Sequence, residues 1–182
     1  MDLSGVGVWS SQLRYGDPAE SAEAAAELEE LGFTALWIPD AGGPVLDSVD
    51  HLLASTKQVV IATGILNLWM HEPSDVAARY ASLTMTYGDR FLLGIGCSNA
   101  ALIESVEPGR YRKPLAATRS FLDTLDAAEQ PVPVENRVLA ALGPKMLELS
   151  ATRARGAHPY LGTPEHTRQA REVLGDGSLL LP

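Results

Sequence analysis

The sequence predicts an α/β fold built from parallel strands, and three observations lead to this prediction. Short apolar runs rich in β-branched residues alternate with helical stretches of about a dozen residues. Several helices begin with a capping residue followed by proline, as at Asp17-Pro18 and Thr163-Pro164. Glycine ends helices, as at Gly32. Strict alternation of this kind implies parallel pairing with right-handed crossovers.

Seven strands are expected, and each of the first six leads through a loop to a helix. The strands are expected at residues 6–10, 35–39, 59–66, 91–96, 138–142, 158–161 and 178–181. The helices are expected at residues 18–31, 45–58, 73–87, 114–129, 144–155 and 164–174. Two architectures fit this order: an open doubly wound sheet, or a (βα)8 TIM barrel that stops early. A complete barrel has about 250 residues, so this chain would be an incomplete one of about six and a half βα units.

Composition narrows the class of protein. The chain has 182 residues and a formal net charge of −9, which argues against nucleic acid or an anionic membrane as a general partner. A single cysteine, Cys97, excludes an internal disulfide and suits a reducing, cytoplasmic location. The first residues lack a signal-peptide pattern, and no apolar run reaches the roughly 20 residues of a membrane span. We find no metal-ligand spacing, P-loop or dinucleotide fingerprint.

Four segments in order carry a family resemblance. They are WIPD at residues 37–40, ATGILNLW at 62–69, GDRFLLGIG at 88–96 and AALGPKMLEL at 140–149. Together they resemble the luciferase-like monooxygenase superfamily, and within it the actinobacterial enzymes described as F-420-dependent oxidoreductases. The resemblance extends over about residues 5 to 182. It implies the barrel architecture, with residues 1–182 as a single domain shortened at its C-terminus.

The resemblance also implies a function and a site. Members bind the deazaflavin F-420, or FMN as the alternative, and move a hydride to or from a small organic substrate. In members, a non-prolyl cis peptide after the third strand lies against the ring, and the matching bond here is Gly64-Ile65. The candidate catalytic residues are Asp40, at the end of WIPD, and His71, in the loop after the third strand. The candidate cofactor-binding residues are Asp40, Gly64, Ile65, Asn67, Cys97, Ser98, Asn99, Ala141, Gly143 and Thr163.

Each of these side chains also has an ordinary structural interpretation. Asp40 would equally serve as a turn aspartate at a strand end, and His71 as a solvated loop histidine. We expect His158 to be a hydrogen-bonded core histidine and Cys97 a small buried residue. Among the tryptophans, Trp69 is the best candidate to stack on a ring. Two interpretations remain for the basic residues Arg110, Arg112 and Lys113. They are either solvated residues at the start of a helix, or they bind the anionic tail of the cofactor.

Two departures from the family pattern lead to alternative functions. The histidine that often follows the WxPD aspartate is Ala41 here, and the seventh and eighth βα units that close a barrel are missing. The first hypothesis remains an F-420-dependent oxidoreductase. The second is a non-catalytic, shortened relative that acts as a homodimer or binds a partner protein, because an open barrel exposes sheet edges. The third is a sequence that simply lacks the rest of an ordinary enzyme.

Overall fold

A single sheet of parallel strands runs through the chain, which a computed structural model describes from residue 1 to 182. Its strands are β1 (Gly7–Trp9), β2 (Ala35–Ile38), β3 (Val60–Thr63), β5 (Phe91–Gly96), β6 (Arg137–Leu139), β7 (Gly156–Ala157) and β8 (Leu179–Leu180). Each pairs with the next in this order, and a short strand, β4 (Leu66–Asn67), pairs beside β5. A doubly wound sheet would reverse its strand order, and this sheet does not. The chain therefore has the barrel-type order, left incomplete because β1 and β8 do not pair.

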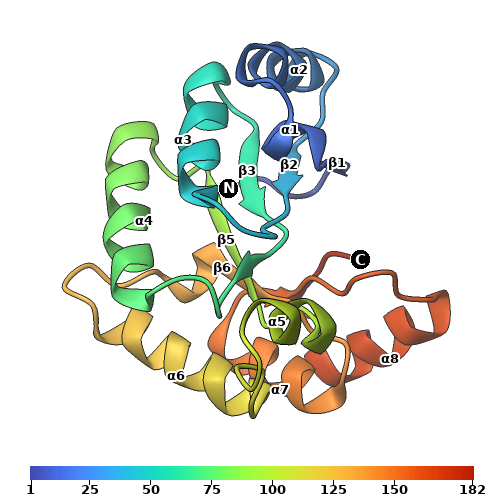
Figure 1. Ribbon diagram of the computed structural model, residues 1–182. Helices are drawn as coiled ribbons and strands as arrows, with labels where there is room; N and C mark the ends of the chain where they lie inside the picture. Colours follow the sequence, from blue (N-terminus) through green and yellow to red (C-terminus); the bar gives the residue numbers. More distant parts are fainter.

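The helices lie on the outer side of the curled sheet. Six of them connect successive strands: α2 (Pro18–Glu30), α3 (Val45–Ser55), α4 (Pro73–Tyr87), α6 (Pro114–Ala127), α7 (Pro144–Arg153) and α8 (Pro164–Leu174). Figure 1 shows these six following one another around the sheet in chain order, from blue to red. The bounds of α4 and β5 are those predicted, because proline and glycine mark their ends. Two short helices, α1 (Gln12–Tyr15) and α5 (Ala100–Val106), and a 3-10 turn, η1 (Val134–Asn136), lie in the predicted loops.

One strand was predicted at the wrong place. The sixth strand comprises Gly156–Ala157 and not residues 158–161. Pro159 has no N–H with which to continue a parallel ladder. Gly156 is required instead, because a Cβ there would overlap the backbone of Leu179 in β8. His158 consequently lies immediately after the strand, at its carboxyl end.

The two faces of the sheet bury different side chains. In β2, Leu36 and Ile38 join the large core beneath the helices, whereas Ala35 and Trp37 point into the barrel interior. The interior cluster consists of Ala35, Trp37, Val60, Ala62, Leu92 and Val138. Side chains therefore fill the interior, as in other barrels, and leave the carboxyl ends of the strands as the open end. None of the helices is long and apolar enough to cross a bilayer.

At the opposite end of the strands, Glu29 ties α2 to the start of β3. Its carboxylate accepts hydrogen bonds from the backbone N–H groups of Lys57, Gln58 and Val59 at 2.6–3.0 Å. Burial alone would raise the pKa of Glu29, but these hydrogen bonds outweigh it and hold the pKa below its ordinary value.

We therefore expect Glu29→Gln to lower the free energy of unfolding by about 1–2 kcal/mol at neutral pH, since a charged acceptor of three N–H groups is lost. Because the folded-state pKa is depressed, this contribution is present above the unfolded pKa of about 4.3 and disappears as the pH falls. Urea unfolding at pH 7 and pH 3 measures it, with Glu30→Gln as the control for an exposed neighbour. Equal unfolding midpoints for the two variants at pH 7 would contradict the prediction.

Candidate functional site

The carboxyl ends of the parallel strands form the open end of the barrel, which we call the mouth. Residues that follow β2, β3, β5 and β7 meet there because the strands run parallel and in order. They include Asp40, Gly64, Cys97 and His158. Ligands bind at this end in barrels of this kind, so the mouth is the first place to look for a site.

Asp40 and His71, the two predicted catalytic residues, form a pair at the mouth. His71 Nε2 lies 2.7 Å from Asp40 Oδ2. The same carboxylate accepts hydrogen bonds from the backbone N–H groups of Asn67, at 3.0 Å, and Gly42, at 3.1 Å. The side chain of Asp40 is inaccessible to solvent, whereas that of His71 is 18% exposed. The carboxylate is thus enclosed, and the imidazole is the member of the pair that solvent reaches.

The environment keeps Asp40 charged. Burial alone would raise its pKa, but the hydrogen bonds from His71, Asn67 and Gly42 outweigh burial and hold the pKa of Asp40 below its ordinary value. A permanent carboxylate next to an imidazole fixes the orientation of the ring. The pair therefore holds the His71 ring in one orientation at the mouth.

The break between β3 and β4 lies beside this pair. The Gly64–Ile65 peptide bond is cis, as the resemblance implied. Gly64 O accepts a hydrogen bond from Trp9 Nε1 at 2.7 Å. A Cβ at Gly64 would come within 3.0–3.1 Å of the rings of Trp9 and His158. The side chain of Ile65 lies against Gly96, where an added Cβ would be 2.8 Å away. The half-buried backbone of Gly64 thus lies directly against the rings of Trp9 and His158.

Asn67 and Cys97 support the loops around the mouth. Asn67 is fully buried, and its Oδ1 accepts a hydrogen bond from Trp69 N at 3.2 Å. The carbonyl of Cys97 accepts one from Trp69 Nε1 at 2.8 Å, and its thiol lies 3.6 Å from the Tyr111 hydroxyl. Trp69 and Tyr111 contact each other with ring centroids 5.7 Å apart. Burial and the neighbouring thiol raise the pKa of Tyr111 to about 12. Together these contacts form an aromatic wall at one side of the mouth.

The remaining predicted residues are less closely gathered. Ser98 has a positive φ of 54°, which is uncommon for a serine, directly after β5. Asn99 caps α5 by accepting a hydrogen bond from Leu102 N at 2.9 Å. Thr163 similarly caps α8 through His166 N at 3.2 Å. Ala141 is buried with α7 and α8 and does not line the mouth.

Gly143 differs from these residues because its surroundings are open. It precedes α7 without a side-chain cap, and a Cβ built on it would meet nothing within 4 Å. Pro144 has no N–H, and the N–H groups of Met146 and Leu147 both bond to Gly143 O at 3.0 Å. In the first turn of α7 only the N–H of Lys145 is therefore free to bind an anion such as phosphate.

Three residues at the mouth were not predicted as part of the site. Trp9 and Tyr111 were not proposed, and His158 was expected in the core. Trp9 ends a strand, which is a usable signal in a parallel α/β fold. Tyr111 has no such signal, because long-range contacts place its loop near Cys97. The backbone N–H groups of Gly109 and Tyr111 donate to the Glu104 carboxylate at 2.6 and 2.9 Å, and Arg110 from the same loop donates to Trp69 O.

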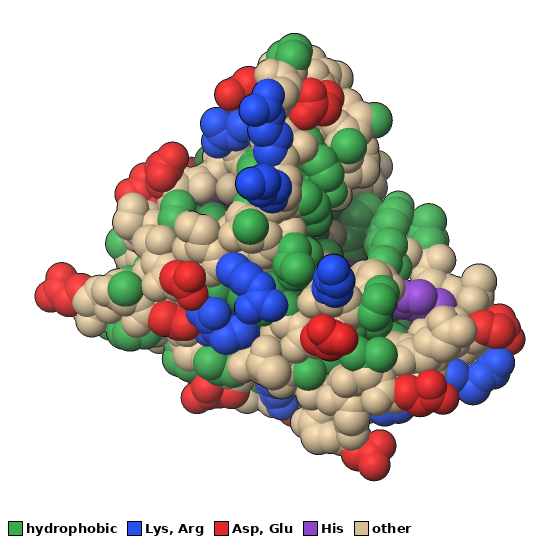
Figure 2. Space-filling model, turned by 90° about the horizontal axis from the view of Figure 1, so that it is seen from below, with side chains coloured by type: hydrophobic (Ala, Val, Ile, Leu, Met, Phe, Trp, Pro, Cys, Tyr) green, Lys and Arg blue, Asp and Glu red, His purple; other side chains and the backbone are tan.

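Apolar and basic side chains surround the mouth. Trp9, Leu142, Tyr160 and Leu161 are all large and 44–85% exposed. Figure 2 shows a hollow with hydrophobic walls in the face seen from below, and Lys and Arg side chains beside it. Of the basic cluster, Arg110 donates to Trp69 O at 3.0 Å and pairs with Glu107. No group of three His, Cys, Asp or Glu side chains is placed to hold a metal ion.

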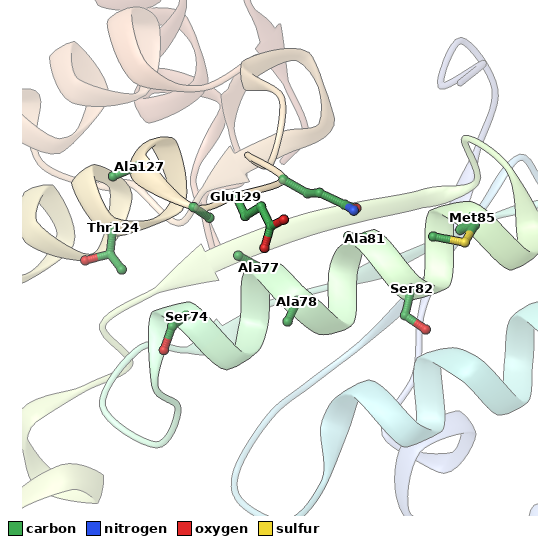
Figure 3. Close-up of a pocket in the computed structure, with 11 residues that line it drawn as sticks. Ser74, Ala77, Ala78, Ala81, Ser82, Met85, Thr124, Ala127 and Glu129 are labelled. Atoms are coloured by element: carbon green, nitrogen blue, oxygen red, sulfur yellow. The ribbon is translucent and has the colours of Figure 1, made fainter.

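A separate groove of about 580 Å³ lies on the outside of the barrel between α4 and α6. Figure 3 shows Ala77, Ala78 and Ala81 of α4 along it, with Thr124 and Ala127 on α6. The small side chains on the two helices leave this groove unfilled. None of the predicted site residues lines this groove, so it is distinct from the mouth.

Comparison with known proteins agrees with this geometry. A sequence model described as luciferase-like monooxygenase matches residues 3–175. A Mycobacterium tuberculosis protein that carries the provisional name of a coenzyme F-420-dependent oxidoreductase is 31% identical over 133 residues, which is 70% of this chain and 37% of that protein. The chain therefore spans well under half the length of this relative.

Two solved structures show the same fold at low sequence identity. An F-420-dependent secondary alcohol dehydrogenase superimposes with a TM-score of 0.76 at 20% identity, covering 95% of this chain and 63% of that one. The oxygenating constituent of a diketocamphane monooxygenase from Pseudomonas putida, in complex with FMN, gives a TM-score of 0.73 at 11% identity, covering 93% and 61%.

Proposed function

The chain belongs to the luciferase-like monooxygenase family, and from this premise we propose that it is an oxidoreductase that binds coenzyme F-420 at the barrel mouth and exchanges a hydride with a small organic substrate. The relative from M. tuberculosis, named for dependence on F-420, supports the deazaflavin. The FMN held by a solved structure of the same fold keeps FMN as the alternative ring. In this proposal, residues 1–182 act as one domain.

The residues at the mouth fit a flat ring. The backbone at Gly64 is free of a side chain, and Ile65, Trp9 and Trp69 supply apolar or aromatic surfaces next to it. When bound, F-420 supplies the carbon that gives or takes the hydride, and the protein supplies orientation and exclusion of water. The exposed N-terminus of α7 at Gly143, where the N–H of Lys145 is free, offers one hydrogen bond to the phosphate of such a cofactor. Arg112 and Lys113, both exposed, suit its anionic tail.

The observation that carries this proposal is the 2.7 Å contact between Asp40 and His71 beside the Gly64–Ile65 bond. In the family pattern a histidine often follows the aspartate directly, whereas Ala41 stands there in this chain. His71 comes from the loop after β4 and reaches the same carboxylate. We assign it the proton-transfer role, with Asp40 holding the imidazole in place.

A titration with F-420, followed through its fluorescence, tests the proposal. We expect saturable binding with a dissociation constant in the micromolar range, and weaker binding of FMN. An absence of binding of both rings at about 1 mM would reject the proposed function.

The second candidate is a non-catalytic relative that acts as a homodimer or binds a partner. The observation in its favour is that β1 and β8 each keep one unpaired edge. A second copy that covers these edges would also be compatible with the enzyme. Light scattering distinguishes the states: a dimer that binds neither ring supports the second candidate, and a stable monomer contradicts the homodimer.

A further inference from the structure

His158 occupies the floor of the mouth. It follows β7 directly, and its ring stacks on Trp37 with centroids 4.5 Å apart and an interplanar angle of 21°. Its Nδ1 lies 2.7 Å from the carbonyl oxygen of Leu181. Its Nε2 lies 3.1 Å from the position that a Cβ on Gly64 would occupy. The imidazole is thus fixed on one side and directed toward the Gly64 backbone on the other.

These contacts determine which nitrogen carries the proton. A carbonyl oxygen only accepts hydrogen bonds, so Nδ1 donates to Leu181 and bears the hydrogen. Burial lowers the pKa of His158, and the hydrogen bond to Leu181 only partly opposes it. The ring is therefore neutral at pH 7, and Nε2 presents a lone pair. Nε2 makes no hydrogen bond to the protein.

The other three histidines are arranged in the opposite way. In His51, His71 and His166 the Nε2 atom makes the hydrogen bond, to Pro18 O, Asp40 Oδ2 and Leu142 O at 2.7–2.8 Å. His158 is the one histidine held through Nδ1 with Nε2 free. A fixed, neutral acceptor without a protein partner, next to the half-buried Gly64 backbone, is a feature that a bound ligand would satisfy.

We propose that His158 Nε2 is a hydrogen-bond acceptor for an O–H or N–H group of the ligand that lies over Gly64. The proposal rests on the proposed function, and it adds a binding residue and a chemical requirement to that site: the ligand carries a donor at this position. The donor belongs either to the ring cofactor or to a hydroxyl-bearing substrate, and the experiment below separates the two sources.

In a protein labelled with ¹⁵N-histidine, the ¹⁵N chemical shift of His158 Nε2 reports directly whether this atom is protonated or accepts a hydrogen bond. In the free protein we expect His158 as the neutral Nδ1–H tautomer at pH 7. One arm adds F-420 alone, and the other adds F-420 with 2-propanol as a hydroxyl probe. A change in the Nε2 shift of His158 toward a hydrogen-bonded value in the first arm assigns the donor to the cofactor. A change only in the second assigns it to substrate.

Ligand binding by variants of His158 provides a second, independent measurement. His158→Phe keeps a ring to stack on Trp37 but removes the acceptor, and His158→Gln retains an acceptor oxygen. We expect His158→Phe to weaken the ligand identified in the NMR arms about 5- to 10-fold, and His158→Gln to recover part of this loss. His51→Gln, far from the mouth on α3, is the matched control and should bind as the wild type does.

The outcomes are separable. Binding of F-420 with no change at Nε2 in either arm overturns the proposal and leaves the proposed function intact. If neither F-420 nor FMN binds, the proposed function fails, and the spectrum of the free protein then tests His158. An Nδ1–H tautomer with an Nε2 shift typical of an unbonded lone pair supports a free acceptor, whereas an Nε2–H tautomer or a protonated ring at pH 7 overturns it.

Discussion

Replacement of Gly94 by alanine is expected to lower the free energy of unfolding by more than about 3 kcal/mol, enough to leave the protein largely unfolded if its stability is ordinary. A Cβ on Gly94 would overlap the backbone carbonyl of Thr63 in the neighbouring strand. Thr63 Oγ1 also donates to Gly94 O at 2.7 Å and accepts from Gly94 N at 2.9 Å. Both residues are buried in the middle of the sheet, so neither backbone has room to move.

Urea unfolding followed by tryptophan fluorescence and circular dichroism measures this effect. Gly177→Ala is the matched control, because a Cβ there meets nothing within 4 Å, and its midpoint should stay near that of the wild type. A Gly94→Ala protein with the wild-type midpoint would show that β3 and β5 are not paired as described.

The second large effect is expected at Asp40. Asp40→Ala removes the acceptor of the backbone N–H groups of Asn67 and Gly42 and the partner of His71. We expect a loss of about 2–4 kcal/mol in stability, since buried donors are left without partners. We also expect at least about a 100-fold fall in kcat/KM with any substrate that the wild type oxidises or reduces, because His71 loses its orientation.

The stability that Asp40 contributes is expected to fall as the pH is lowered. The folded-state pKa of Asp40 is depressed, so its contribution to stability is present above the unfolded pKa of about 3.9 and is lost as the pH falls through the folded value. The stability difference between wild type and Asp40→Asn should therefore shrink below about pH 4. Asp176→Asn, an exposed acid in the turn after α8, should show no such trend. A difference that is independent of pH would contradict the role of the charge.

Local signals explain what the sequence predicted well. The alternation of strands and helices and the bounds of α4 and β5 depend on short stretches of chain, whereas the position of the cis bond was expected from the family resemblance. Proline and glycine at helix ends act within a few residues, so they can be read without knowledge of the fold. The misplaced sixth strand shows the limit, because its position depends on contact of Gly156 with the backbone of Leu179.

The sequence by itself therefore determined a parallel α/β chain, which the family resemblance assigned to the barrel type, with Asp40, His71 and Gly64 as candidates near strand ends. Only the tertiary structure decided that His71 reaches Asp40, 31 positions away, and that His158 is anchored by Leu181, 23 positions away, with its other nitrogen free. The physical reason is that hydrogen bonding between distant residues depends on the curl of the sheet. That curl comes from the packing of all the strands together and not from any one segment.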